Sequence, residues 1–117
     1  SQHAAIAALQ GDQSCVDEML EAFRRRSALI TKLLNQIEGV SCQQPGGAFY
    51  AFANIIDTPF SSNAFQEKLL EDYGVAGIAG TSFGSFGEGY IRLSCANSDE
   101  AIERAVSRIQ KMLDESA

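Results

Sequence analysis

A single arginine in a segment with the pattern of a β-strand is the residue best suited to chemistry. Residues 87–96 read Gly-Glu-Gly-Tyr-Ile-Arg-Leu-Ser-Cys-Ala. Alternate side chains of a strand point to opposite faces, so Ile91, Leu93 and Cys95 would face a core and Arg92 would lie on the other face. A planar, permanently charged guanidinium in that position can bind a carboxylate through two parallel hydrogen bonds.

Residue types alone leave two interpretations of Arg92 open. The strand follows a glycine-rich segment, residues 80–89, which places Arg92 near the end of a sheet, where a small carboxylate could reach it. The alternative is an arginine on an exposed edge strand that pairs with a surface Glu or Asp, because an unpaired charge is costly to desolvate. Without further information, residue types favour this alternative.

Length and charge limit the classes of function. The chain has 117 residues, of which 45% are hydrophobic, and this predicts one domain over residues 1–117 with one core. Its net charge of −6 argues against nucleic acid or an anionic membrane as a partner, since both need a basic face. No apolar run approaches the roughly 20 residues of a membrane span, and no signal peptide is recognisable. We expect a cytoplasmic protein, with organelle targeting of a longer protein left open.

Cysteine and histidine content argues against metal and triad chemistry. Cys15, Cys42 and Cys95 form no C-x-x-C pair, and an odd number at scattered positions fits reduced thiols better than a disulfide framework. His3 is the only histidine and has no cysteine near it in the sequence. We therefore expect no metal site and no Ser-His-Asp or Cys-His triad.

Hydrophobic periodicity and turn residues predict alternating helices and strands. Helices are predicted at 1–10, 14–39, 61–74 and 98–113. The second begins with a capping box at Ser14–Asp17, and either Ser61 or Ser62 caps the third. Strands are predicted at 40–43, 48–55, 75–79 and 90–96, with residues 80–89 as a long hairpin loop. This order predicts an α/β (α+β) fold in which helices cover one face of a small, largely antiparallel sheet.

Other candidate motifs have ordinary structural interpretations. Residues 24–26 are three arginines on the polar side of the long helix, where a solvated face is the default and interdomain salt bridges are the alternative. Glu88 has no second carboxylate placed to form an acid/base pair. Four aromatic residues are expected in the core or at an interface rather than in a base-stacking platform: Tyr50, Phe52, Phe83 and Phe86.

Five segments, in order, carry a resemblance to a known family. The chain resembles the C-terminal small domain of class I, fold type I pyridoxal-phosphate-dependent aminotransferases, the aspartate aminotransferase group. The resemblance covers nearly the whole chain. The segments are S-Q-H-A-A-I-A-A-L at 1–9, R-R-R-S-A-L-I at 24–30, P-G-G-A-F-Y-A-F at 45–52, G-V-A-G-I-A-G-T-S-F-G at 74–84 and G-E-G-Y-I-R-L-S-C-A at 87–96.

The resemblance implies roles for two residues. Arg92 matches the family's arginine that binds the α-carboxylate of the substrate, and Phe49 matches an aromatic residue beside it. The implied enzyme transfers an amino group between an amino acid and a 2-oxo acid, with aspartate and 2-oxoglutarate as the expected type. Its implied partners are this substrate, a large domain absent from this chain, and a second subunit of a homodimer. Residues 1–12 would be the remnant of a helix that continues from the large domain.

The chain also departs from the family pattern. The family's cofactor-binding lysine lies in the large domain, whereas Lys32, Lys68 and Lys111 all fall on helices with solvated neighbours. The resemblance thus implies no catalytic and no cofactor-binding residue in this chain. Pyridoxal phosphate is expected only in the full-length enzyme, and the isolated chain is expected to be inactive. The alternatives are a stand-alone α/β module that binds a small carboxylate and an assembly domain without a ligand.

Overall fold

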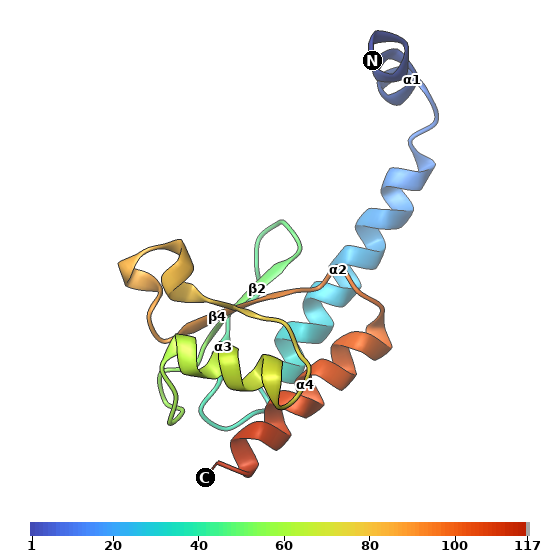
Figure 1. Cartoon of the computed structure of the whole chain (residues 1–117). Helices are drawn as coiled ribbons and strands as arrows, with labels where there is room; N and C mark the ends of the chain where they lie inside the picture. The colour runs from blue at the N-terminus through green and yellow to red at the C-terminus, as the bar shows by residue number, and fades with distance from the viewer. Residues whose placement is uncertain (117) are drawn as a thin grey trace.

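The fold combines four helices with a small sheet, and the computed structural model describes residues 1–116 (Figure 1). The helices are α1 (Gln2–Gln10), α2 (Ser14–Leu34), α3 (Ser62–Glu71) and α4 (Asp99–Asp114). The strands are β1 (Ser41–Cys42), β2 (Tyr50–Asn54), β3 (Ile78–Ala79) and β4 (Tyr90–Ser94). Two short 3-10 helices, η1 (Gly80–Phe83) and η2 (Ser85–Gly87), join β3 to β4.

The four strands form one antiparallel sheet in the order β1-β2-β4-β3. In β4, Ile91 and Leu93 are buried, as are Ala51 and Ala53 of the neighbouring β2. Helices α2, α3 and α4 cover this face, and α2 and α4 lie side by side (Figure 1). The predicted α+β fold, with an antiparallel sheet covered on one face by helices, is confirmed.

The predicted starts of α2, α3 and α4 are confirmed, but the capping role predicted for Ser14 is wrong. The hydroxyls of Ser61 and Ser98 accept the backbone N–H of the residues three positions later, and these caps begin α3 and α4. Ser14, by contrast, does not cap α2 but is its first residue. The carboxylate of Asp12 accepts the Ser14 backbone N–H at 3.0 Å, so the polar turn before the helix does what the capping box was expected to do.

Helix α2 ends at Leu34, five residues before the predicted end at Gly39. The Asn35 side chain explains the difference, because it donates to the carbonyl of Cys42 at 2.8 Å and accepts the Cys42 N–H at 2.9 Å. An asparagine that binds a backbone elsewhere competes with helix continuation. Ile37 keeps its apolar role because it is buried in the following turn rather than in a helix.

The strands are also shorter than predicted. The segment predicted at 75–79 pairs with β4 only through Ile78 and Ala79, and the segment predicted at 40–43 pairs with β2 only through Ser41 and Cys42. Both are outer strands, so each has a ladder partner on one side only and pairs just where that neighbour runs alongside.

The N-terminal region projects from the packed body. Helix α1 has no buried residue, and it lies at the far end of the N-terminal half of α2 (Figure 1). The principal extents of the molecule, 55 × 29 × 25 Å, reflect this projection. In the part of the chain that the structure describes, no helix is long and apolar enough to cross a membrane.

Candidate functional site

Arg92 lies at the centre of β4, on the face of the sheet that the helices leave open. Its neighbours across the sheet are Phe52 of β2 and Ile78 of β3, so β4 is an inner strand. Within residues 1–116, no carboxylate forms an ion pair with Arg92 and its guanidinium donates to no protein group. The alternative of an edge-strand arginine with a surface acid for a partner is therefore wrong.

Two aromatic rings hold the Arg92 guanidinium instead. Its Cζ lies 4.3 Å from the ring centroid of Tyr50 and 4.4 Å from that of Phe83. A cation over an aromatic ring is attracted to the negative face of that ring. A guanidinium carries five N–H donors, and those of Arg92 form no hydrogen bond or ion pair within residues 1–116. The half-buried arginine is thus positioned yet has its hydrogen-bonding capacity unused.

The two rings come from different elements. Tyr50 begins β2 and is the diagonal neighbour of Arg92 across the β2–β4 pair, a distance that long side chains can bridge. Phe83 ends η1 in the loop between β3 and β4. Tyr50, Phe52, Phe83 and Phe86 were predicted in the core or at an interface, and none of them lies in the core. Phe86 is 98% exposed, so the core is excluded for it and its place at an interface stays a prediction.

Phe49 lies near this group but not over the guanidinium. Its ring packs against Tyr50, with ring centroids 4.5 Å apart, and against Phe23 of α2 at 5.8 Å. Its carbonyl accepts the backbone N–H of Cys95 at 2.9 Å. Ala48, just before it, has a φ of 58°, a left-handed conformation that costs a non-glycine residue roughly 1–2 kcal/mol. Phe49 touches Arg92's aromatic support rather than Arg92 itself, and its role at the substrate stays a prediction.

The open face of the sheet also contains a hollow of about 710 Å³. Tyr50 and Phe52, which both neighbour Arg92, line one side of it, and Asn54 and Tyr90 continue the same face of the sheet. Phe52 and Tyr90 stack with their rings 5.0 Å apart and nearly parallel. The other walls of the hollow are Asn35 and residues 41–46, and Arg92 itself does not line it.

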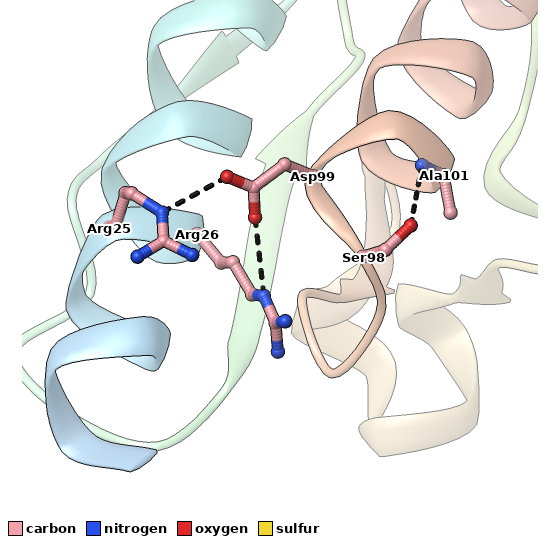
Figure 2. A network of polar contacts seen from close by, with 5 residues as sticks. All are labelled: Arg25, Arg26, Ser98, Asp99 and Ala101. Atoms are coloured by element: carbon pink, nitrogen blue, oxygen red, sulfur yellow. Dashed lines mark hydrogen bonds and ion pairs between the residues drawn. The ribbon is translucent and has the colours of Figure 1, made fainter. Parts of the chain in front are cut away.

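A second arginine cluster has a different arrangement. Arg25 and Arg26 of α2 donate from their Nε atoms to the Asp99 carboxylate of α4, at 3.0 and 3.3 Å (Figure 2). The hydrogen bond from Arg25, and then the one from Arg26, lower the pKa of Asp99. Arg25 stays largely exposed, as the expectation of a solvated face has it, whereas Arg26 is half-buried. Both nevertheless join α2 to α4 through Asp99, and Arg24 pairs within α2 with Glu21.

The remaining titratable groups have structural roles. The hydrogen bond to Glu115 raises the pKa of Tyr73 to about 12. Burial raises the pKa of the Cys42 and Cys95 thiols, and Cys15 is exposed; all three cysteines are free. Among the residues that the structure describes, no three His, Cys, Asp or Glu side chains come together as a metal site would require.

Residues 1–109 match the family described as aminotransferase class I and II. The chain belongs to this family. An aspartate aminotransferase from Pyrococcus horikoshii is 43% identical over 115 residues, which make up 97% of this chain and 29% of that protein. An aspartate/prephenate aminotransferase from Nitrosomonas europaea is also 43% identical, over 97% of this chain and 31% of that protein.

Solved aminotransferase structures have the same fold. The aromatic aminotransferase from Pyrococcus horikoshii superposes with a TM-score of 0.93 and 39% identity, over 98% of this chain and 31% of that one. The aspartate aminotransferase from Rhizobium meliloti superposes with a TM-score of 0.88 and 35% identity, over 97% of this chain and 30% of that one. The chain thus spans about 30% of the length of the aminotransferases it matches.

The family implies pyridoxal phosphate in the full enzyme, and the described residues of this chain do not fit that cofactor by themselves. Lys32 is exposed on α2. Lys68 pairs with Asp72 at 2.9 Å and Lys111 with Glu115 at 3.7 Å. None of these amines lies in a buried pocket that would make it nucleophilic at neutral pH. None of these three lysines is placed to form a covalent bond with the cofactor.

Proposed function

We propose that this chain is the C-terminal small domain of a pyridoxal-phosphate-dependent aminotransferase and that Arg92 binds the α-carboxylate of its substrate. The observation that carries the proposal is the guanidinium of Arg92, which lies over the rings of Tyr50 and Phe83 and has no ion pair with any described residue. The chain contains 15 acidic residues, so this arginine lacks a partner because of where it lies and not because acids are scarce.

The proposed ligand is the part of the substrate that all amino acids and 2-oxo acids share. Relatives of this chain are named for aspartate, for aromatic amino acids and for aspartate with prephenate, and these substrates differ in their side chains. Every amino acid and 2-oxo acid carries a carboxylate next to the reacting carbon. A fork that binds the carboxylate by two hydrogen bonds fixes that carbon relative to the reaction centre, which reduces the entropy lost on reaching the transition state.

In this proposal the chain contributes binding and positioning, and the rest of the enzyme contributes the cofactor and its lysine. We propose aspartate and 2-oxoglutarate as the substrate type, and a homodimer as the state of the full-length enzyme. The isolated chain is proposed to be inactive, because the residues it contains do not fit the cofactor. Phe49 is proposed as a support for the carboxylate site through its contact with Tyr50.

The test is the binding of a non-reacting carboxylate, succinate, to the full-length enzyme and its Arg92→Ala variant by calorimetry. Truncating one partner of a buried charged pair costs about 2–5 kcal/mol, so the dissociation constant should rise roughly 30- to several-thousand-fold. An unchanged dissociation constant would refute the role of Arg92. Arg92-dependent binding of succinate to the isolated chain at equal affinity would instead favour the stand-alone carboxylate-binding module.

A further inference from the structure

The loop that carries Phe83 to Arg92 is held by the first turns of α3. The Ser62 hydroxyl is fully buried and accepts the backbone N–H groups of Gly89 at 2.9 Å and Tyr90 at 3.1 Å. In return, an Oε1 atom of Glu88 accepts the Ser62 backbone N–H at 3.0 Å. This N–H belongs to the start of α3, where the helix dipole favours a carboxylate. We call Ser62 and Glu88 the loop latch.

Two further contacts hold the other end of the loop to the same helix. The Thr81 hydroxyl donates to the side-chain oxygen of Asn63 at 3.1 Å, and the Ala79 N–H donates to the side-chain oxygen of Gln66 at 2.7 Å. The end of β3 and the start of β4, which flank the loop, are therefore both attached to the N-terminal half of α3. The loop cannot move without breaking contacts to that helix.

Close backbone contact pins the base of the loop. A Cβ atom built on Gly80 would lie 2.1 Å from the carbonyl oxygen of Gly87, and one on Gly87 would lie 1.9 Å from that of Gly80. Both separations are shorter than a van der Waals contact, so only glycine allows the two ends of the loop to meet. The residues between them, including Phe83, form a loop that is closed at its base by glycine and tied at its side to α3.

We propose that Phe83 is a positioning residue for the substrate carboxylate and that the loop latch sets its place over Arg92. This inference rests on the proposed function of Arg92 and adds residues that act through it. Phe83 is 52% exposed, so its ring contributes little to the core. Its contact with the guanidinium, 4.4 Å from Cζ to the ring centroid, restricts the rotamers of a long side chain before the ligand arrives.

Phe86 provides a matched control for Phe83. Both phenylalanines belong to the same loop, and Phe86 is 98% exposed with no ring or cation contact in the described part of the chain. In the full-length enzyme, Phe83→Leu should raise the dissociation constant for succinate, and the KM for the amino-acid substrate, roughly 3- to 30-fold. The kcat at saturation should change less than about twofold, because Phe83 does not touch the reacting atoms.

Conservative replacement separates positioning from packing. Phe83→Tyr keeps an aromatic face over the guanidinium and should restore the wild-type dissociation constant, whereas Phe86→Leu should leave it unchanged. All three variants should keep the wild-type thermal midpoint, since both rings are more than half exposed. Thermal unfolding of each variant checks this point.

The latch is tested by Glu88→Ala against Glu67→Ala. Glu67 is an exposed acid on α3 whose side chain forms no hydrogen bond with another described residue. Both variants replace a glutamate by alanine, so they share the same change in charge. Glu88→Ala should weaken succinate binding by about threefold or more, and Glu67→Ala should not. Equal binding by wild type, Phe83→Leu and Glu88→Ala would overturn the inference if Arg92→Ala still weakens binding. If Arg92→Ala also binds normally, the proposed function itself fails.

Discussion

At the junction of α2 and α4, Arg25 and Arg26 both donate to the Asp99 carboxylate, whereas on the open face of the sheet Arg92 has two aromatic rings and no carboxylate. At the α2–α4 junction, the Nε donors of Arg25 and Arg26 bind a carboxylate of the same chain, and this links the two helices. On the open face of the sheet, the rings of Tyr50 and Phe83 contact the cation and its N–H donors bind no described protein group. We propose that this difference separates arginines that stabilise the fold from an arginine that binds a ligand.

The comparison also shows what residue types alone conceal. An arginine that already forms an ion pair within the protein gains little free energy from binding a second anion, because its charged N–H donors are already used. An arginine held by aromatic rings keeps the bidentate geometry that a free carboxylate needs. The four predictions below test this difference, from the largest expected effect to the smallest.

The largest expected difference is in catalysis by the full-length enzyme. Arg92→Ala should lower kcat/KM roughly 30- to several-thousand-fold, since it removes a charged partner of the substrate. Arg25→Ala, the matched control, should change kcat/KM less than about twofold because its partner is Asp99. Steady-state kinetics of both variants is the measurement, and a similar loss in the two would show that the sites do not differ in kind.

A smaller loss is expected from lysine at the same two positions. Arg92→Lys keeps the charge and loses one of two parallel hydrogen bonds, so kcat/KM should fall roughly 10- to 100-fold. Arg25→Lys should keep both activity and thermal stability, because a largely exposed ion pair tolerates a point charge. Full activity in Arg92→Lys would argue against bidentate binding of the carboxylate.

Thermal stability should depend on the α2–α4 junction and not on Arg92, the reverse of the order expected for kcat/KM. Asp99→Asn removes the shared partner of Arg25 and Arg26, and it should lower the midpoint of thermal unfolding by no more than a few degrees. Arg92→Ala should not lower it, since no described carboxylate depends on Arg92. Differential scanning calorimetry distinguishes the two variants, and a lower midpoint for Arg92→Ala alone would reverse the assignment of roles.

The smallest effect is a pH dependence at the α2–α4 junction. The hydrogen bonds from Arg25 and Arg26 lower the pKa of Asp99 below the ordinary value of 3.8. The stabilisation from a carboxylate with a lowered pKa is complete above its unfolded pKa and is lost as pH falls through the folded one. The stability difference between wild type and Asp99→Asn should therefore be constant above about pH 5 and shrink below pH 3.8. Urea unfolding at several pH values measures it, and a difference that grows with acid would contradict this account.

Local signals in the sequence were reliable where the interaction itself is local. Ser61 and Ser98 cap helices by accepting an N–H three residues away, and both starts are as predicted. The alternation of β4, with Ile91 and Leu93 buried and Arg92 on the opposite face, is also as predicted. Each of these features depends on backbone geometry over a few residues, which periodicity and cap residues encode directly.

The errors occur where distant residues decide. Helix α2 stops at Leu34 because Asn35 reaches Cys42, although the apolar period continues to Ile37. The sequence showed only that Glu88 has no second carboxylate placed to form an acid/base pair, and no local pattern predicts that it accepts the N–H of Ser62. No sequence pattern indicates either contact, because only the folded chain brings the two partners close together.

The sequence by itself determined the α+β class, most element positions and the family, because apolar periodicity, caps and ordered motifs are properties of neighbouring residues. Only the tertiary structure decided which arginines are satisfied. Asp99 lies 74 positions after Arg25, and the ring of Phe83 reaches Arg92 through a loop tied to α3. Strand register and helix packing bring these residues together. The chemistry of a side chain is present in the sequence, but its partner is determined only by the folded chain.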